Sequence, residues 1–322
     1  MPNVLTHGLM ANQVVQKLDV NRVSKAIEAH WRPFLFGSNG PDFLFYHNYL
    51  PWMKNKDIDW IRALGGKIHK EKINEFYRQG IAYYQLQRPG HEVFLSFLAG
   101  HLCHWSLDSI AHPYVFARTG LLEGETEYHH IRFESMVDAM MVEDVLLRPL
   151  SDFPTYKFAE LTSSEQRIIA LGYQYMILKT FDIQVPLKEL VDCMKTMYQL
   201  LHVLFDPKAW RFHTVQWIET HGLKDPFKYT KHVVHGDLDQ DHDILNLEHK
   251  PWRHPSHPEE VSTQSFLELF EQSIQRGVHV IHLLEASLET KGDTLTAFID
   301  NRDYEMGKND GLPARVFDLI YD

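Results

Sequence analysis

The chain has 322 residues, of which 44% are hydrophobic and 23% are charged, a composition typical of a folded globular protein. Asp and Glu number 43 against 32 Lys and Arg, and the formal charge is -11. That balance argues against a sequence-independent grip on nucleic acid, which needs a basic surface. The 21 His residues are unusually many for a chain of this length.

The compartment is predicted from cysteine usage and from the apolar segments. The sequence has no run of about 18 apolar residues that would cross a membrane. Its opening segment, MPNVLTHGLMANQVV, lacks the basic head, apolar core and cleavage site of a secretion signal. Cys103 and Cys193 both lie in apolar helical segments, so we expect reduced core residues. These features predict a cytoplasmic protein without stable membrane insertion.

Helical periodicity runs through most of the chain. Residues 6–18 form the first expected helix, with Thr6 as its N-cap, and residues 20–31 form the second. A turn with two Gly and one Pro at 36–43 presents Asp42. The central helix, 92–113, is expected to end at Pro113. Further helices are predicted at residues 57–64, 69–86, 123–146, 163–180, 187–205, 209–221 and 263–288.

Strand-like alternation is scarce, and residues 225–258 are rich in Pro, His and Asp without helical period. The sequence therefore predicts an all-α, multi-helix bundle. Residues 1–205 are expected to form a helical domain. Residues 206–322 are expected to form a helical and loop-rich C-terminal extension packed on it as one compact unit.

The helix at 92–113 is apolar on nearly every side, which is typical of a helix buried inside a protein. Four polar residues fall on a single stripe of it at 3.6 residues per turn: His101, His104, Asp108 and His112. A bare carboxylate in such a place costs several kcal/mol unless it is compensated. A bound cation would compensate it. The alternative is that these are core polar residues hydrogen-bonded to their neighbours.

The spacing of the stripe limits how a cation can bind. His104 and Asp108, one turn apart, can chelate one metal from a single helix face. His112 lies about 6 Å further along the helix, and one metal with bonds of about 2 Å cannot reach both ends of the stripe. If His112 is a ligand, two metals are present and Asp108 lies near both. His101 is then not a ligand itself but contacts the ligands and helps to orient them.

Four short motifs occur in order along the first 140 or so residues. They are THG at residues 6–8, GPD at 40–42, H-x-x-x-D from His104 to Asp108 with His112 following, and H-x-x-x-E from His130 to Glu134. Together they resemble the zinc-dependent phospholipase C family, whose superfamily includes bacterial alpha-toxins and single-strand-specific zinc nucleases. The resemblance implies a helical bundle around a buried multinuclear metal site.

The resemblance also implies two or three zinc ions, one pair of them bridged by a shared Asp. One metal would be held by Asp42, His104, Asp108 and a further His, a second by His7 and Asp108, and a third by His112, His130 and Glu134. For the further His the candidates are His47 and His69, and His69 is preferred because a helix can fix it.

Three features differ from the secreted members of the family. Those enzymes use a mature N-terminal Trp at the second metal, where Met1 or Pro2 stands here. The further His follows Asp42 less closely, and His112 follows Asp108 by a single turn. The C-terminal part does not resemble the membrane-docking β-sandwich of alpha-toxins.

Clustered zinc ions suit the hydrolysis of phosphate esters, because they polarise phosphoryl oxygens and stabilise the leaving oxygen. The resemblance thus implies a phosphodiesterase or phosphomonoesterase in which Asp42 binds metal or takes a proton from the attacking water. A small phosphorylated substrate or a phospholipid head group fits the acidic chain better than nucleic acid does. The alternative is a metal-stabilised binding or structural protein without turnover.

Two further patterns point to other site types. His242-Asp243 matches the dipeptide of HD-type phosphohydrolases, which alone is a poor match. Residues 237–248 (DLDQDHDILNLE) imitate a calcium loop, but His242 stands where the sharp turn needs Gly and Pro251 prevents the exiting helix. An acidic loop that covers the cleft is the simpler interpretation.

The cysteine assignment is directly testable. In the denatured protein, Cys103 and Cys193 should both react with a thiol reagent without prior reduction, because buried thiols in a reducing compartment do not pair. A disulfide between them would contradict the predicted compartment.

Overall fold

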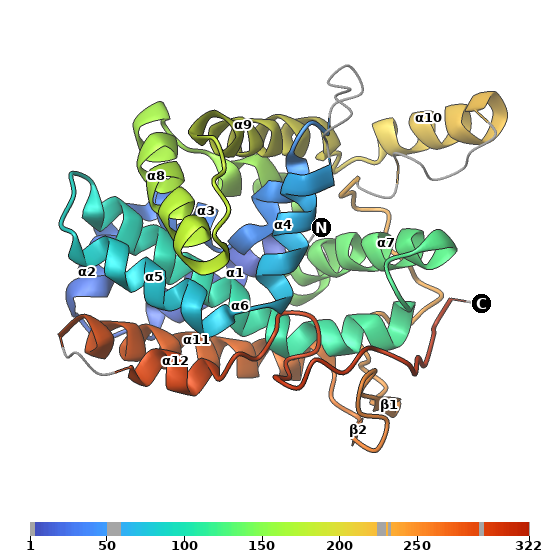
Figure 1. The fold of residues 1–322 in the computed structure, drawn as a ribbon. Coiled ribbons are helices and arrows are strands. Elements are labelled where there is room, and N and C mark those ends of the chain that lie inside the picture. Colours follow the sequence, from blue (N-terminus) through green and yellow to red (C-terminus); the bar gives the residue numbers. More distant parts are fainter. Residues whose placement is uncertain (1–3, 50–58, 224–229, 231–232, 290–292, 322) are drawn as a thin grey trace.

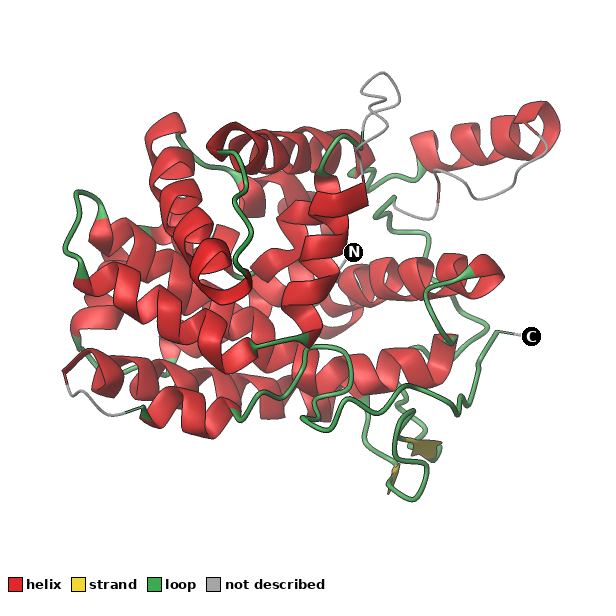
Figure 2. Ribbon diagram, in the orientation of Figure 1, coloured by secondary structure: helices red, strands yellow, loops and turns green. Residues whose placement is uncertain are grey.

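The central helix, α6 (His91–Thr119), is 29 residues long and is buried along nearly its whole length. We describe the chain from a computed structural model that covers residues 4–49, 59–223, 230, 233–289 and 293–321. In these residues the only strands are β1 (Trp252–Arg253) and β2 (Val261–Ser262), which pair antiparallel. Everything else with regular structure is helical (Figures 1 and 2). The predicted all-α fold is confirmed.

Several of the other helices pack directly against α6. In chain order the other helices are α1 (Val4–Gln16), α2 (Arg22–Ala29), α3 (Trp31–Gly37), α4 (Asp59–Lys70), α5 (Ile73–Gln85), α7 (Gly124–Met140), α8 (Ser163–Phe181), α9 (Leu187–Leu204), α10 (Trp210–Ile218), α11 (Phe266–Glu289) and α12 (Thr294–Ile299). Short 3₁₀ and π turns connect them: η1 (Gly40–Tyr46), η2 (Met141–Val145), η3 (Leu150–Asp152), η4 (Thr155–Ala159) and η5 (Glu219–Leu223).

Two helix ends differ from the sequence prediction. Pro113 does not end α6, which continues through buried Tyr114 and Val115 to Thr119. A proline inside a helix removes one backbone hydrogen bond, and here the burial of the following turn outweighs that loss. Thr6 is not an N-cap but lies inside α1, where its backbone N–H and its hydroxyl both donate to Asp138.

Two other predicted helices have different limits. Residues 20–31 contain α2 and the first residue of a separate helix, α3, because His30 has a non-helical backbone conformation and interrupts the helix. His69 does not begin a helix: it lies near the C-terminal end of α4.

The helices α3 and α6 approach each other closely. A Cβ atom at Gly100 would collide with the Phe34 carbonyl oxygen, and one at Gly37 would collide with the Phe97 carbonyl oxygen. The two glycines therefore let the backbones touch. This contact fixes the end of α3, which leads into η1, relative to the row of polar residues on α6.

On the other side of α6, α11 packs along its length (Figure 1). One cluster of buried apolar side chains extends from Val4 to Tyr304 and so includes residues on both sides of residue 205. The division of the chain there stays a prediction. The helix α10 projects from the rest of the bundle in Figure 1.

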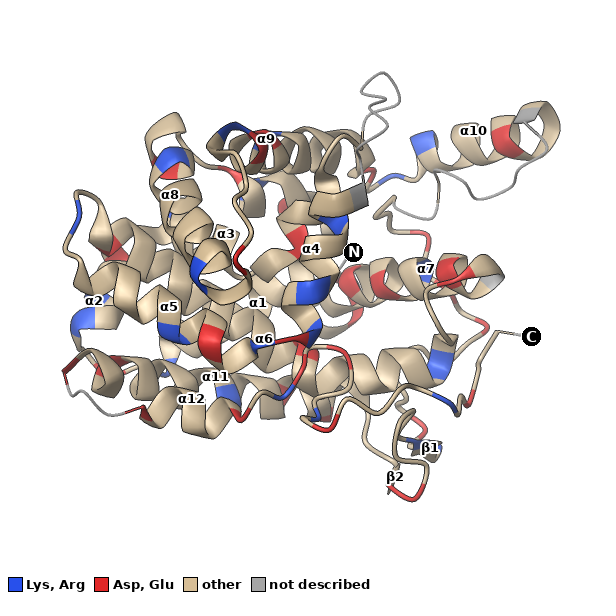
Figure 3. Ribbon diagram, viewed as in Figure 1, with Lys and Arg blue, Asp and Glu red and all other residues tan. Residues whose placement is uncertain are grey.

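The described helices contain no segment with the length and apolar character that a membrane crossing requires. Lys and Arg are interspersed with Asp and Glu in the view of Figure 3. Cys103 and Cys193 are both buried and unpaired, as predicted.

Gly100→Ala tests the contact between α3 and α6. We expect it to lower the free energy of unfolding by about 1–3 kcal/mol, because the added methyl group forces two backbones apart. Gly66→Ala in α4 is the matched control, since a Cβ there meets nothing within 4 Å. It should raise stability by about 0.5–1 kcal/mol through helix propensity alone. Urea unfolding measures both, and equal effects of the two changes would contradict the close approach.

Candidate metal centre

The eight predicted site residues form one connected group of contacts in the middle of the bundle. They come from five elements: His7 from α1, Asp42 from η1, His69 from α4, His104, Asp108 and His112 from α6, and His130 and Glu134 from α7. Six of them are nearly inaccessible to solvent, and the side chains of Asp42 and His112 are 17% and 16% accessible.

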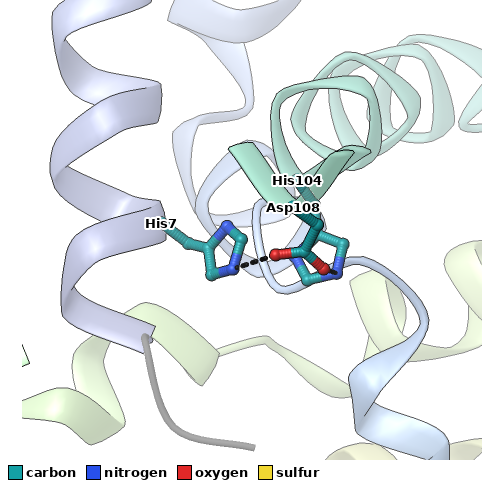
Figure 4. Close-up of side chains that lie close together, drawn as sticks. All are labelled: His7, His104 and Asp108. Carbon is teal, nitrogen blue, oxygen red and sulfur yellow. Dashed lines mark ion pairs between the residues drawn. The ribbon is translucent and has the colours of Figure 1, made fainter. Parts of the chain in front are cut away.

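Asp108 lies at the centre of this group. Its Oδ2 is 2.9 Å from His104 Nε2, and its Oδ1 is 3.1 Å from His7 Nε2 and 3.6 Å from His112 Nε2. Figure 4 shows His7 and His104 meeting the Asp108 carboxylate from two different helices. His7, His104 and Asp108 each offer an atom within 4.8 Å of the others, which is close enough for one metal ion.

A second group adjoins the first through His104. Asp42 Oδ1 is 3.1 Å from His69 Nε2 and 3.9 Å from His104 Nε2, and these three also lie within 4.8 Å of one another. Gly40 makes this approach possible, because its φ of +53° suits glycine and a Cβ there would strike the His104 ring. Pro41 stabilises the start of η1 and Asp42 follows it.

The third group lies on the other side of Asp108. Glu134 Oε1 is 3.3 Å from His112 Nε2 and 3.4 Å from His130 Nε2. His130 and Glu134 are one turn apart on α7, and His112 reaches across from α6. His112 thus contacts both carboxylates, Asp108 and Glu134.

Hydrogen bonds behind the histidines assign their protons. His69 Nδ1 donates to the Gly65 carbonyl at 2.8 Å, His104 Nδ1 to the Ser38 carbonyl at 3.2 Å, and His112 Nδ1 to the Tyr304 carbonyl at 3.1 Å. His130 Nδ1 donates to the Thr119 hydroxyl at 2.9 Å, because that hydroxyl itself donates to Val115. In all four rings the Nδ1–H is fixed and Nε2 faces a carboxylate, the arrangement found in metal-ligating histidines.

This arrangement fits a bound cation and is unfavourable without positive charge. A neutral imidazole with its proton on Nδ1 presents a lone pair at Nε2, which repels a carboxylate oxygen. His104 Nε2 and Asp108 Oδ2, although close, make no hydrogen bond, and both are buried. Buried polar atoms without partners are costly. A metal ion between them would satisfy both atoms.

The pKa values of the site show the same demand for positive charge. Burial opposes protonation of His112, but the Asp108 and Glu134 carboxylates outweigh it and raise the pKa of this imidazole to about 10. Burial likewise opposes ionisation of Asp108, but the neighbouring His104, His112 and His7 hold its pKa well below the usual range. The site therefore stabilises negative carboxylates and attracts a positive charge to balance them.

Asp138, one turn beyond Glu134 on α7, holds α1 in place. Its carboxylate accepts from the backbone N–H of Leu5 at 3.0 Å and of Thr6 at 2.9 Å, and from the Thr6 hydroxyl at 2.6 Å. Burial raises the pKa of Asp138 to about 7, although these donors favour ionisation. An acidic group at the first turn of α1 suits the helix dipole, and it fixes the direction of His7.

Tyr304 and the surroundings of His101 were not identified by sequence reasoning. The Tyr304 carbonyl accepts from His112, its backbone N–H donates to the His69 carbonyl at 3.0 Å, and its hydroxyl meets that of Tyr77 at 2.9 Å. His101 contacts the hydroxyls of Tyr77 at 2.9 Å and Tyr173 at 3.3 Å instead of a carboxylate. The segment around Tyr304 has no periodicity or motif from which its hydrogen bonds to His112 and His69 could be predicted.

The structure separates the two alternatives for the further His. His69 contacts Asp42, whereas His47 Nε2 lies 3.0 Å from Glu189 Oε2. Met1 and Pro2, which stand in the place of the N-terminal Trp, lie outside the described residues.

A small pocket of about 80 Å³ opens onto the group, lined by six of the eight site residues together with Phe45, Phe116, Leu122 and Glu305. The acidic loop at 237–248 lies elsewhere. Asp237, Asp239 and Asp241 line a separate cavity of about 440 Å³ beside Arg132 of α7, and Asp239 accepts from the backbone N–H groups of Asp241 and His242. The loop is thus closed by its own hydrogen bonds, and the expectation that it covers the metal pocket was wrong.

Comparison with known families agrees with this site. A family model described as zinc dependent phospholipase C matches residues 6–201, which span all eight site residues. The chain belongs to this family. No curated protein and no solved structure matches the chain.

Metal analysis of variants tests the site. His69→Ala and His130→Ala should each lower the zinc content per chain after dialysis, because each removes a ligand from a different group and leaves an incomplete coordination shell. His47→Ala is the matched control, since it removes an equally buried histidine that faces Glu189. Unchanged metal content in both site variants, or a loss in the control alone, would show that the ligands are misplaced.

Proposed function

We propose that the chain is a zinc-dependent phosphoric ester hydrolase. The observation that supports this best is the convergence of three carboxylates and five imidazoles around one pocket, with Asp108 between two groups. Membership of the zinc-dependent phospholipase C family supports the same class of reaction.

The residues divide into three sets of ligands for two or three ions. Asp42, His69, His104 and Asp108 would hold one ion, His7 and Asp108 would contribute to a second, and His112, His130 and Glu134 would hold a third. When bound, zinc supplies positive charge that polarises a phosphoryl oxygen and stabilises the leaving oxygen.

Asp42 is the residue best placed to move a proton. It lines the pocket, it is the most accessible of the site carboxylates, and His104 and His69 hold its pKa below the usual range although burial opposes this. In the reaction a water oxygen forms a bond to phosphorus and the ester P–O bond breaks. The Asp42 carboxylate takes the proton of that water and returns it to the departing alkoxide.

The substrate class follows from charge and size. The formal charge of -11 disfavours nucleic acid, and a pocket of about 80 Å³ has room for a phosphoryl group at the site residues. A small phosphorylated substrate or a phospholipid head group fits both limits. The two unpaired cysteines favour a reducing compartment such as the cytoplasm.

Asp108→Asn separates this function from that of a metal-stabilised binding protein. The amide keeps the size but loses the anion that neutralises adjacent cations, so hydrolysis of a chromogenic phosphodiester or monoester should fall about a hundredfold or more, a loss of roughly 3 kcal/mol in transition-state stabilisation. Asp241→Asn is the control, since it removes the same charge from the exposed acidic loop. Turnover that is no faster in the unaltered zinc-loaded protein than in Asp108→Asn would favour the binding protein.

A further inference from the structure

An apolar cavity of about 420 Å³ adjoins the metal pocket. The two share a wall, because Phe45 of η1 and Leu122, which precedes α7, line both. Behind that wall the cavity is lined largely by aliphatic side chains, among them Ile131 of α7 and Leu200 and Leu204 of α9. The metal pocket and a larger, mostly apolar cavity therefore lie side by side.

Three of the polar residues at the cavity make hydrogen bonds within the protein. Thr155 donates its hydroxyl to the Leu201 carbonyl at 3.2 Å, and Arg62 donates to the His47 carbonyl at 3.0 and 3.1 Å. Asp138 accepts from the first turn of α1. A sugar or nucleotide placed here would lose water without gaining equivalent hydrogen bonds, which is costly. A hydrocarbon makes no hydrogen bonds to water and therefore does not pay this cost.

The two volumes divide the ligand into two parts. The metal pocket, at about 80 Å³, has room for a phosphoryl group. The cavity, at about 420 Å³, falls in the lower part of the roughly 300–1,000 Å³ range of small-molecule sites. That size has room for one extended hydrocarbon chain.

We propose that this cavity binds a single hydrocarbon chain of the substrate, so that the protein encloses a phosphate ester of one long-chain alcohol with its phosphoryl group at the metal pocket. The assignment of the phosphoryl end rests on the proposed function. The assignment of the apolar end rests on the shared wall, the aliphatic lining and the satisfied polar groups. Each methylene buried in such a site should tighten binding about fourfold.

Binding of alkylphosphonates to the full-length, zinc-loaded protein tests this directly. Methyl-, hexyl-, octyl- and decylphosphonate carry a carbon–phosphorus bond that hydrolysis does not cleave, and each can be titrated calorimetrically below its micelle concentration. We expect affinity to rise steeply from hexyl to decyl. The same affinity for all four compounds would overturn the proposal.

Cavity-filling variants show where the chain binds. Leu200→Trp and Leu204→Trp should abolish the rise with chain length while methylphosphonate still binds, since neither residue lines the metal pocket. Val203→Trp is the control on the same helix, because Val203 is exposed and does not line the cavity. Circular dichroism establishes that each variant is folded, and two cavity variants guard against the failure of one. A rise with chain length that persists in both folded variants would contradict the proposed site.

Ester hydrolysis distinguishes this proposal from the function on which it rests. If chain length controls binding through Leu200 and Leu204 but no ester is hydrolysed, the cavity proposal stands and the hydrolase proposal fails. If phosphate esters are hydrolysed with a kcat/KM that does not depend on chain length, the hydrolase stands and the cavity proposal fails.

Discussion

The buried carboxylate of Asp108 is the constraint on which the rest of the structure depends. Only 2% of its side chain is accessible, and the imidazoles around it turn Nε2 toward it. For His104 the Nδ1 proton is committed to the Ser38 carbonyl, so this ring presents a lone pair to an anion. In an apolar interior that arrangement costs several kcal/mol unless a cation compensates it. The fold thus encloses a site suited to positive charge, and the elements around α6 supply the other imidazoles and carboxylates that face it.

Much of the surrounding architecture serves to hold those ligands from behind. The contact of Gly37 and Gly100 brings the end of α3 against α6, which places the Ser38 carbonyl on His104. The C-terminal segment contributes Tyr304, whose backbone joins His69 and His112 from opposite sides. Outer contacts of this kind fix ring orientation and tautomer in metal sites. The C-terminal segment around Tyr304 therefore helps to shape a centre whose proposed ligands all precede it.

How much of this the sequence predicts depends on whether a contact is local. The stripe of His104, Asp108 and His112 follows from helical period alone, because residues four apart share a face. His7 and Asp42 were reached only through the resemblance to a family, since no local pattern joins them to α6. Tyr304 and the capping of α1 by Asp138 were beyond prediction, because each is a contact across more than 130 residues. The expected helix end at Pro113 was wrong for a related reason: tertiary burial overrides a local propensity.

The position of Asp138 links the metal pocket to the apolar cavity. Its carboxylate holds the first turn of α1, and so the direction of His7, while the same side chain lines the apolar cavity. A change at Asp138 would therefore alter the metal ligands and the cavity wall together, and a loss of activity could not be assigned to either. Leu200 and Leu204 line only the cavity, and His130 lines only the metal pocket. These residues allow the polar and apolar ends of the site to be perturbed separately, although one wall joins them.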